Sequence, residues 1–192
     1  LDLPFSFVYG YSCRFVDMNG DRYPEILIAA DFGTSQYLIN NADGTFTNAT
    51  TTNGTGLDSN GMGNTYADFN NDGRFDWYVT SLTNILSGTP GSGNMLYLQT
   101  ELPHQFIETS VESGCNNGYW SWGADAVDFN HDGFVDIIDT NGARDKQNQN
   151  DPTLLFMNDG TGSFNDQAVA AGINHTGQGR GLLTADFDND GD

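Results

Sequence analysis

The stretch Asp68-Phe69-Asn70-Asn71-Asp72-Gly73-Arg74-Phe75-Asp76 decides the fold of this chain. Counting Asp68 as position 1, side-chain oxygens fall at positions 1, 3, 5 and 9, and glycine stands at position 6. Carboxylates crowded into one tight loop repel one another unless a cation lies between them. Ca²⁺ suits this arrangement because it accepts about six to eight oxygen ligands in flexible geometry. The spacing therefore predicts a calcium loop, in which Gly73 permits the sharp turn.

The same pattern occurs three more times. Residues 128–136 repeat it at every position, residues 186–192 repeat it as far as the sequence continues, and residues 17–25 form a looser copy with glycine at position 4 and glutamate at position 9. A period of roughly 50 to 60 residues is typical of a repeat protein. With the backbone carbonyl of position 7 included, the predicted calcium ligands are Asp17, Asn19, Asp21, Tyr23 and Glu25; Asp68, Asn70, Asp72, Arg74 and Asp76; Asp128, Asn130, Asp132, Phe134 and Asp136; and Asp186, Asp188, Asp190 and Asp192.

Two other interpretations of these loops fit less well. Plain Asp-Gly turns need only one or two such residues, not oxygens at a fixed set of offsets. An EF-hand closes with a bidentate acid at position 12, where this sequence has Ile28, Val79 and Asp139. The residues that follow position 9 also favour strands over the exit helix of an EF-hand.

The composition narrows the function classes. Lys+Arg 6 against Asp+Glu 26 gives a net charge of −20, which argues against nucleic acid or an anionic membrane surface as a partner. Much of this acidity belongs to the loops, and 37% hydrophobic residues argue against a disordered acidic chain. No apolar run is long enough for a transmembrane helix, so membrane insertion is not expected.

Each repeat predicts four short strands separated by Asp- and Gly-rich turns. The expected strands are 12–16, 25–30, 36–40 and 45–49; then 64–67, 76–82, 94–99 and 105–109; then 122–127, 136–140, 153–157 and 163–167. The repeats run approximately over 7–61, 62–118, 119–178 and the beginning of a fourth at 179–192. Four-stranded antiparallel units repeated in this way are propeller blades. We therefore expect an all-β fold in which residues 1–192 form a single, partial β-propeller.

The cycle Asn-x-Asp-Gly-x-Phe followed by Ala-Asp-Phe-(Asn/Asp)-x-Asp-Gly-x-x-Asp resembles the FG-GAP/VCBS repeats of integrin-α-like propellers. It is most similar to the repeats that accompany ASPIC/UnbV-type extracellular proteins, and the resemblance covers Tyr11 to Asp192. It implies a propeller that carries about one Ca²⁺ per loop, in exported adhesion, matrix or carbohydrate-binding proteins. Other protein chains or extracellular glycans are the implied partners. The first loop departs from the pattern, with Arg22 at position 6.

The opposite end of the blades is a second candidate site. The loops between second and third strands are long at 83–93 and 141–152 but short at 31–35, and insertions on one face of a repeat protein often mark a binding face. We expect Tyr119, Trp120, Trp122, Arg144 and Lys146 near that end. Aromatic and cationic side chains could there stack on sugar rings and hold acidic groups. The alternative is that Trp120 and Trp122 pack between blades.

The function expected from these features is a structural or adhesive role outside the cell, without catalysis. Calcium sites of extracellular modules bind at about 10⁻⁴–10⁻³ M, which resting cytosol would not fill, so we expect a secreted or cell-surface protein. His104, His131 and His175 are far apart in the sequence, and no nucleophile-elbow motif occurs. A lectin-like module is the first alternative. A calcium-dependent polysaccharide lyase is the second, since some calcium propellers have that activity.

Several features stay open at this level. Cys13 and Cys115 could pair with each other, pair between chains or remain buried thiols, and Asn48, Asn53 and Asn174 match the N-glycosylation pattern. Three full cycles and the start of a fourth are fewer than the four to eight or so blades that close a propeller. We therefore expect further blades from a longer chain, with self-assembly of neighbouring chains as the alternative.

Overall fold

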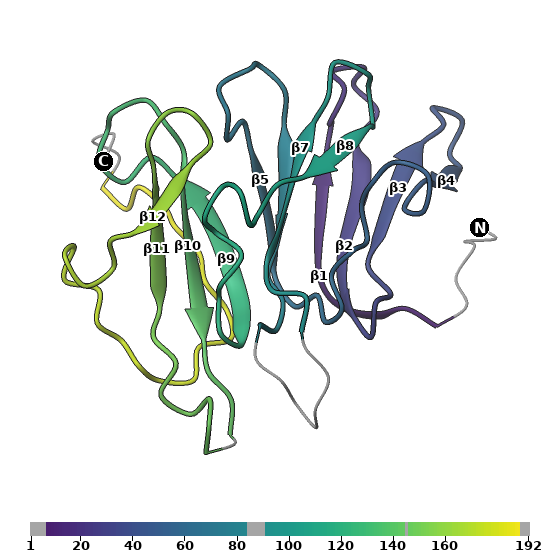
Figure 1. Ribbon diagram of the computed structural model, residues 1–192. Coiled ribbons are helices and arrows are strands. Elements are labelled where there is room, and N and C mark those ends of the chain that lie inside the picture. The colour runs from purple at the N-terminus through teal and green to yellow at the C-terminus, as the bar shows by residue number, and fades with distance from the viewer. Residues whose placement is uncertain (1–6, 84–90, 145, 189–192) are drawn as a thin grey trace.

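The computed structural model describes residues 7–83, 91–144 and 146–188, and the regular structure in these ranges is β-strand (Figure 1). Twelve strands form three antiparallel sheets, each with its four strands in chain order. The first sheet contains β1 (Tyr9–Val16), β2 (Glu25–Asp31), β3 (Gln36–Asn40) and β4 (Phe46–Asn48); the second β5 (Asn64–Ala67), β6 (Asp76–Val79), β7 (Met95–Gln99) and β8 (Phe106–Glu108); the third β9 (Ser121–Val127), β10 (Asp136–Asn141), β11 (Leu154–Asn158) and β12 (Phe164–Asp166). The all-β, propeller-like architecture expected from the sequence is confirmed.

The middle strands explain why the sheets stack. Every residue of β6 and of β10 is buried, so these strands are covered on both faces. A strand that is apolar on both sides needs a neighbouring layer against each face. The last strand of each sheet, in contrast, has only three residues and exposes part of its surface.

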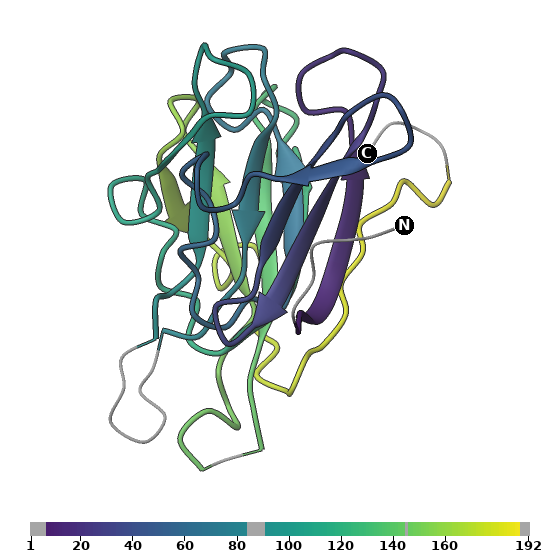
Figure 2. The ribbon, with the colours of Figure 1, turned by 90° about the vertical axis from the view of Figure 1, so that its right-hand side faces the viewer.

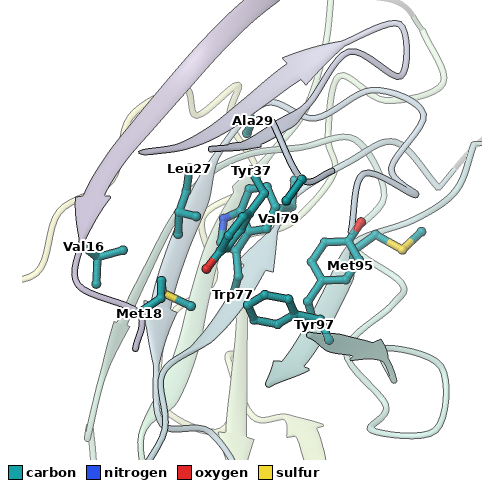
Figure 3. Packing of buried hydrophobic residues seen from close by; sticks show 11 residues of the cluster. Val16, Met18, Leu27, Ala29, Tyr37, Trp77, Val79, Met95 and Tyr97 are labelled. Carbon is teal, nitrogen blue, oxygen red and sulfur yellow. The ribbon is translucent and has the colours of Figure 1, made fainter. Parts of the chain in front are cut away.

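Aromatic side chains fill the interface between the first and second sheets. Figure 3 shows Tyr37 of β3 packed against Trp77 of β6 and Tyr97 of β7. The Trp77 ring centroid lies 6.2 Å from that of Tyr37 and 5.4 Å from that of Tyr97. All three side chains are completely buried. Burying large aromatic side chains stabilises such an interface most.

A second cluster of the same kind joins the second sheet to the third. Phe69 and Tyr78 from the second repeat meet Ile137, Phe156 and Phe164 from the third. The sheets therefore pack face to face along the chain, as neighbouring propeller blades do.

The connections fall at two ends of the stack (Figures 1 and 2). We call residues 17–25, 68–76 and 128–136 the acidic loops; each joins the first strand of a sheet to its second, and they lie together at the upper end in Figure 1. We call the other end, where the connections between second and third strands lie, the connector end. It includes residues 31–35, 80–83 and 142–144.

The expected strand limits are correct to within a few residues, with two informative differences. The strand expected at 76–82 ends at Val79, because Leu82 instead forms an isolated bridge with Trp120 of the next repeat. Residues 179–188 form no strand and run beside β9, where Thr184 donates its N–H to Asp125 Oδ2 at 2.7 Å. No helix that could cross a membrane is present in the described ranges.

Candidate metal centre and the opposite face

The second acidic loop folds around its own side-chain oxygens. Asp68 Oδ1 accepts the N–H of Asp72 at 2.9 Å, and Asp68 Oδ2 accepts the N–H of Gly73 at 2.8 Å. Asn70 Oδ1 also accepts the N–H of Asp72, and Asp72 Oδ1 accepts that of Arg74 at 3.0 Å. Asp and Asn are suited to such turns because their short side chains reach the backbone two or more residues ahead.

The first and third acidic loops repeat this hydrogen-bond pattern. In the third loop, Asp128 accepts the N–H groups of Asp132 and Gly133 at 3.1 and 2.8 Å. In the first loop, Asp17 accepts those of Asp21 and Arg22 at 3.0 and 2.8 Å. The sequence spacing thus produces one loop geometry three times.

Backbone conformation accounts for the glycines. Position 6 is left-handed in all three loops, with φ of 87° at Gly73, 92° at Gly133 and 74° at Arg22. Position 4 is left-handed as well, with φ of 60° at Asn71 and 78° at Gly20. Glycine adopts this conformation at little cost, whereas a side chain there costs roughly 1–2 kcal/mol. The first loop has exchanged the two positions and places a long side chain where the others have glycine.

The acid at position 9 is buried and connects the loop to the sheet. Asp76 Oδ2 accepts the N–H of Phe69 at 2.9 Å, while Oδ1 accepts the N–H of Gln99, the last residue of β7, at 2.8 Å. Asp136 and Glu25 make the equivalent bonds, although the Glu25 Oε1 bond to the N–H of Asn40 is longer, at 3.4 Å.

Burial strongly disfavours the charged form of these acids. Burial, with a smaller contribution from the neighbouring carboxylates of Asp72 and Asp68, raises the pKa of Asp76 to about 7. Burial is also the main cause that raises the pKa values of Asp136 and Glu25. The backbone N–H groups that these acids bind lower their pKa values in part, and the positive charge of a bound cation would favour the ionised form further.

Three amide side chains that were not predicted from the sequence complete the loops. Asn40, Gln99 and Asn158 each end the third strand of a sheet, and each donates a side-chain N–H to the carbonyl of position 8. Gln99 Nε2 and Asn158 Nδ2 also donate to the carbonyls of Met18 and Phe69 in the preceding repeat, at 2.9 and 2.8 Å. The sequence does carry a signal for these residues, because an Asn or Gln recurs at, or directly after, the end of each predicted third strand.

The donor set of each loop fits calcium in chemical type. It offers carboxylate, amide and carbonyl oxygens, which are the ligands that Ca²⁺ prefers. An ionised carboxylate has about four acceptor sites, so the N–H bonds leave others for a cation. Among the described residues, no three or more Asp, Glu, His or Cys side chains converge closely enough to hold a metal ion as they stand. Asp190 and Asp192 of the fourth loop lie outside the described residues.

One loop contains a cation of its own. Arg74 Nη2 forms an ion pair with Asp72 Oδ2, and it is the only ion pair found within the described ranges. The carbonyls predicted as ligands, those of Tyr23, Arg74 and Phe134, belong to residues whose N–H groups bind the acid at position 5.

At the connector end, the structure brings together some of the predicted ligand-face residues. The rings of Trp120 and Trp122 lie parallel, with centroids 6.4 Å apart, and Tyr11 of β1 meets Trp122 edge-on at 5.8 Å. Arg144 and Lys146 are exposed in the connection after β10. Tyr119 instead packs against the core between the second and third sheets.

The structure shows the state of the two cysteines and the exposure of the three asparagines that match the glycosylation pattern. Cys13 is exposed and Cys115 is buried, and both are free thiols. Among the glycosylation matches, Asn53 is buried, Asn48 is half-buried and Asn174 is exposed.

His104 lies between repeats, with Nδ1 2.9 Å from the Tyr37 hydroxyl and Nε2 3.1 Å from Asn19 Nδ2 of the first acidic loop.

Stacked four-stranded antiparallel sheets, each with an acidic loop after its first strand, define a propeller-like repeat protein. Residues 17–79 match the family model of the FG-GAP-like repeat, so the chain carries a repeat of this family. A similar protein is Cartilage acidic protein 1 of Mus musculus, which is 49% identical over 45 residues. This match covers 23% of the chain and 7% of that protein.

Proposed function

We propose that the chain is part of a calcium-stabilised extracellular repeat protein with a structural or adhesive, non-catalytic role. The observation that carries the proposal is the buried acid at position 9, which recurs in three loops beside further carboxylates. Burying one carboxylate beside further, more exposed carboxylates is unfavourable unless a cation compensates it.

In each loop, the side-chain oxygens at positions 1, 3, 5 and 9 and the carbonyl at position 7 would hold the ion. Ca²⁺ would supply the positive charge that the surroundings of Asp76 and Asp136 favour. It would also fix the end of the first strand relative to the start of the second. The metal would therefore stabilise every sheet at the point where the chain reverses direction.

The location outside the cell is supported by two considerations. Sites of extracellular modules bind calcium at about 10⁻⁴–10⁻³ M, and such concentrations occur outside cells. FG-GAP-like repeats suggest an extracellular protein of the adhesion type, and the name of the similar mouse protein refers to cartilage.

Equilibrium dialysis against Ca²⁺ tests the proposal. We expect about one bound ion per acidic loop at millimolar Ca²⁺, and the loss of about one ion in Asp72→Ala, because four loop ligands alone bind Ca²⁺ too weakly. Glu112→Ala removes an exposed acid outside the loops and should leave the stoichiometry unchanged. Absence of binding at millimolar Ca²⁺ would overturn the calcium role, and unsaturated sugar released from acidic polysaccharide would overturn the non-catalytic one.

A further inference from the structure

Two adjoining cavities lie beside the first strands of the sheets, and no residue of the acidic loops lines either of them. One, of about 280 Å³, is lined by Tyr11 and Arg14 of β1, by Asn64 of β5 and by Arg180. The other, of about 230 Å³, is lined mainly by aromatic residues and by Asp31 and Asn60. Tyr11 and Met62 line both cavities, so the two adjoin, and we call them together the hollow.

The two arginines in the first cavity have unused donors. Arg180 Nη1 donates to the carbonyls of Gly142 and Gly179 at 2.9 and 2.6 Å, and Arg14 Nε donates to the carbonyl of Asn64 at 3.1 Å. In the described part of the chain, Arg180 Nε and Nη2 and both Nη atoms of Arg14 have no hydrogen-bond partner. Neither guanidinium is paired with a carboxylate there, although the chain carries 26 acids.

Trp122 fixes the position of Arg180. The guanidinium carbon of Arg180 lies 4.1 Å from the centroid of the Trp122 ring, and Trp122 Nε1 donates to the same Gly142 carbonyl at 2.9 Å. A guanidinium stacked on an indole and bonded at one nitrogen keeps its other N–H groups in a defined direction. Trp122 therefore acts as a positioning residue and has little ring surface left for a ligand, since Trp120 and Tyr11 also pack against it.

The second cavity offers flat apolar walls and a carboxylate that can accept hydrogen bonds from the hydroxyl groups of a ligand. Tyr11 and Phe32 are 57% and 68% exposed, and Phe32 has a left-handed backbone, with φ of 57°. A bulky side chain in that conformation is strained, and strain of this kind is concentrated at functional sites. Asp31 Oδ1 accepts the N–H groups of Asn60 and Phe32, while Oδ2 has no partner among the described residues.

We propose that this hollow binds an acidic saccharide. Arg14 and Arg180 take its carboxylate or sulfate group through charge-assisted hydrogen bonds. The apolar face of the sugar ring lies against Tyr11, Phe32 and Trp120, and its hydroxyls bond to Asp31. None of the residues that line the hollow belongs to an acidic loop.

The combination of groups favours a saccharide over an acidic peptide. A peptide carboxylate would use the arginines alone, whereas a sugar acid uses the arginines, the aromatic walls and the carboxylate of Asp31 together. The net charge of −20 gives no general attraction for anions, so an acidic ligand depends on these local donors.

Titration followed by tryptophan fluorescence tests the proposal, since Trp120 and Trp122 lie at the hollow. The probes are glucuronate, a sulfated N-acetylglucosamine, their neutral counterparts, inorganic sulfate and a triglutamate peptide. We expect one or both acidic sugars to bind at least about tenfold more tightly than every other probe, because only they engage both cavities.

Variants separate the site from a general charge effect. Arg180→Gln and Arg14→Gln should each weaken binding of the acidic sugar about tenfold or more, and Arg180→Lys should restore part of the loss. Thr51→Glu, which lowers the net charge by the same amount at an exposed position after β4, should leave it unchanged. Circular dichroism confirms that each variant is folded.

Several results would overturn the proposal. Equal affinity for neutral sugars would exclude the arginines as ligands, and equal affinity for inorganic sulfate would leave an anion site without sugar recognition. Equal affinity for triglutamate would indicate a peptide site instead. Failure of both acidic sugars to bind, or unchanged binding in the folded Arg14→Gln and Arg180→Gln variants, would remove the site altogether.

Discussion

The first and second acidic loops follow the same backbone path with different residues at the two strained positions. The second loop has Asn71 and Gly73 there, with φ of 60° and 87°, whereas the first has Gly20 and Arg22, with φ of 78° and 74°. The acid at position 9 also differs: Asp76 makes two short bonds, and one of the two Glu25 bonds extends to 3.4 Å. The positions of the side-chain oxygens and of the two left-handed residues therefore determine the backbone path of the loop. In the first loop the position-9 acid binds this path less tightly, because one of its two hydrogen bonds is longer.

The largest expected difference between the loops concerns position 9. Asp76→Ala should lower the free energy of unfolding by about 2–5 kcal/mol, because it leaves the N–H groups of Phe69 and Gln99 buried without an acceptor. Glu25→Ala should cost less, since one of its bonds is already long. Urea unfolding of both variants in the presence of Ca²⁺ measures the difference. A larger loss for Glu25→Ala would show that the loops do not differ in this way.

The amide at the end of the third strand gives the next largest effect. Gln99→Ala removes bonds to the carbonyls of Phe75 and Met18, and the second of these joins two sheets. We expect a loss of about 1–3 kcal/mol, measured by thermal unfolding. Asn40→Ala is the matched control, because the side chain of Asn40 donates only to Pro24 within its own repeat. Equal losses in the two variants would mean that the bond between sheets adds nothing.

The smallest effect concerns the strained position of the first loop. Arg22→Gly should raise the free energy of unfolding by up to about 1 kcal/mol, because glycine relieves the strain of the left-handed conformation. The higher entropy of the unfolded glycine variant offsets part of this gain. Gly73→Arg, the reverse change in the second loop, should lower it by a similar amount or more. Differential scanning calorimetry resolves both shifts, and a destabilised Arg22→Gly variant would contradict the role of strain.

The fold and the loops were largely accessible from the sequence, whereas the contacts between repeats were not. Strands such as 36–40 and 64–67 were predicted to the residue, because local spacing and turn residues determine them. Gln99 and Met18 are 81 residues apart, and Asn158 and Phe69 are 89 apart, so their pairing depends on how sheets stack.

At the connector end, too, the sequence did not predict which residues from different repeats come together. Trp120 and Trp122 were expected there because they stand at or near the start of a first strand, and Arg144 because it lies in a long loop between second and third strands, but Arg14 and Arg180 were not expected. These arginines line one cavity only because the fold brings β1, β5, β9 and residues 180–182 together there. Nothing in the local sequence of either arginine distinguishes it from an ordinary solvated side chain.

The most direct test of the central claim is thermal unfolding of the chain in excess Ca²⁺ and in excess EGTA. Ligand in about hundredfold excess over its dissociation constant adds about 2.7 kcal/mol per site, so chelation should lower the melting temperature strongly. Asp72→Ala should reproduce part of this loss in Ca²⁺ and show a smaller response to EGTA. A melting temperature that is the same in Ca²⁺ and in EGTA would contradict the claim that these loops are calcium sites.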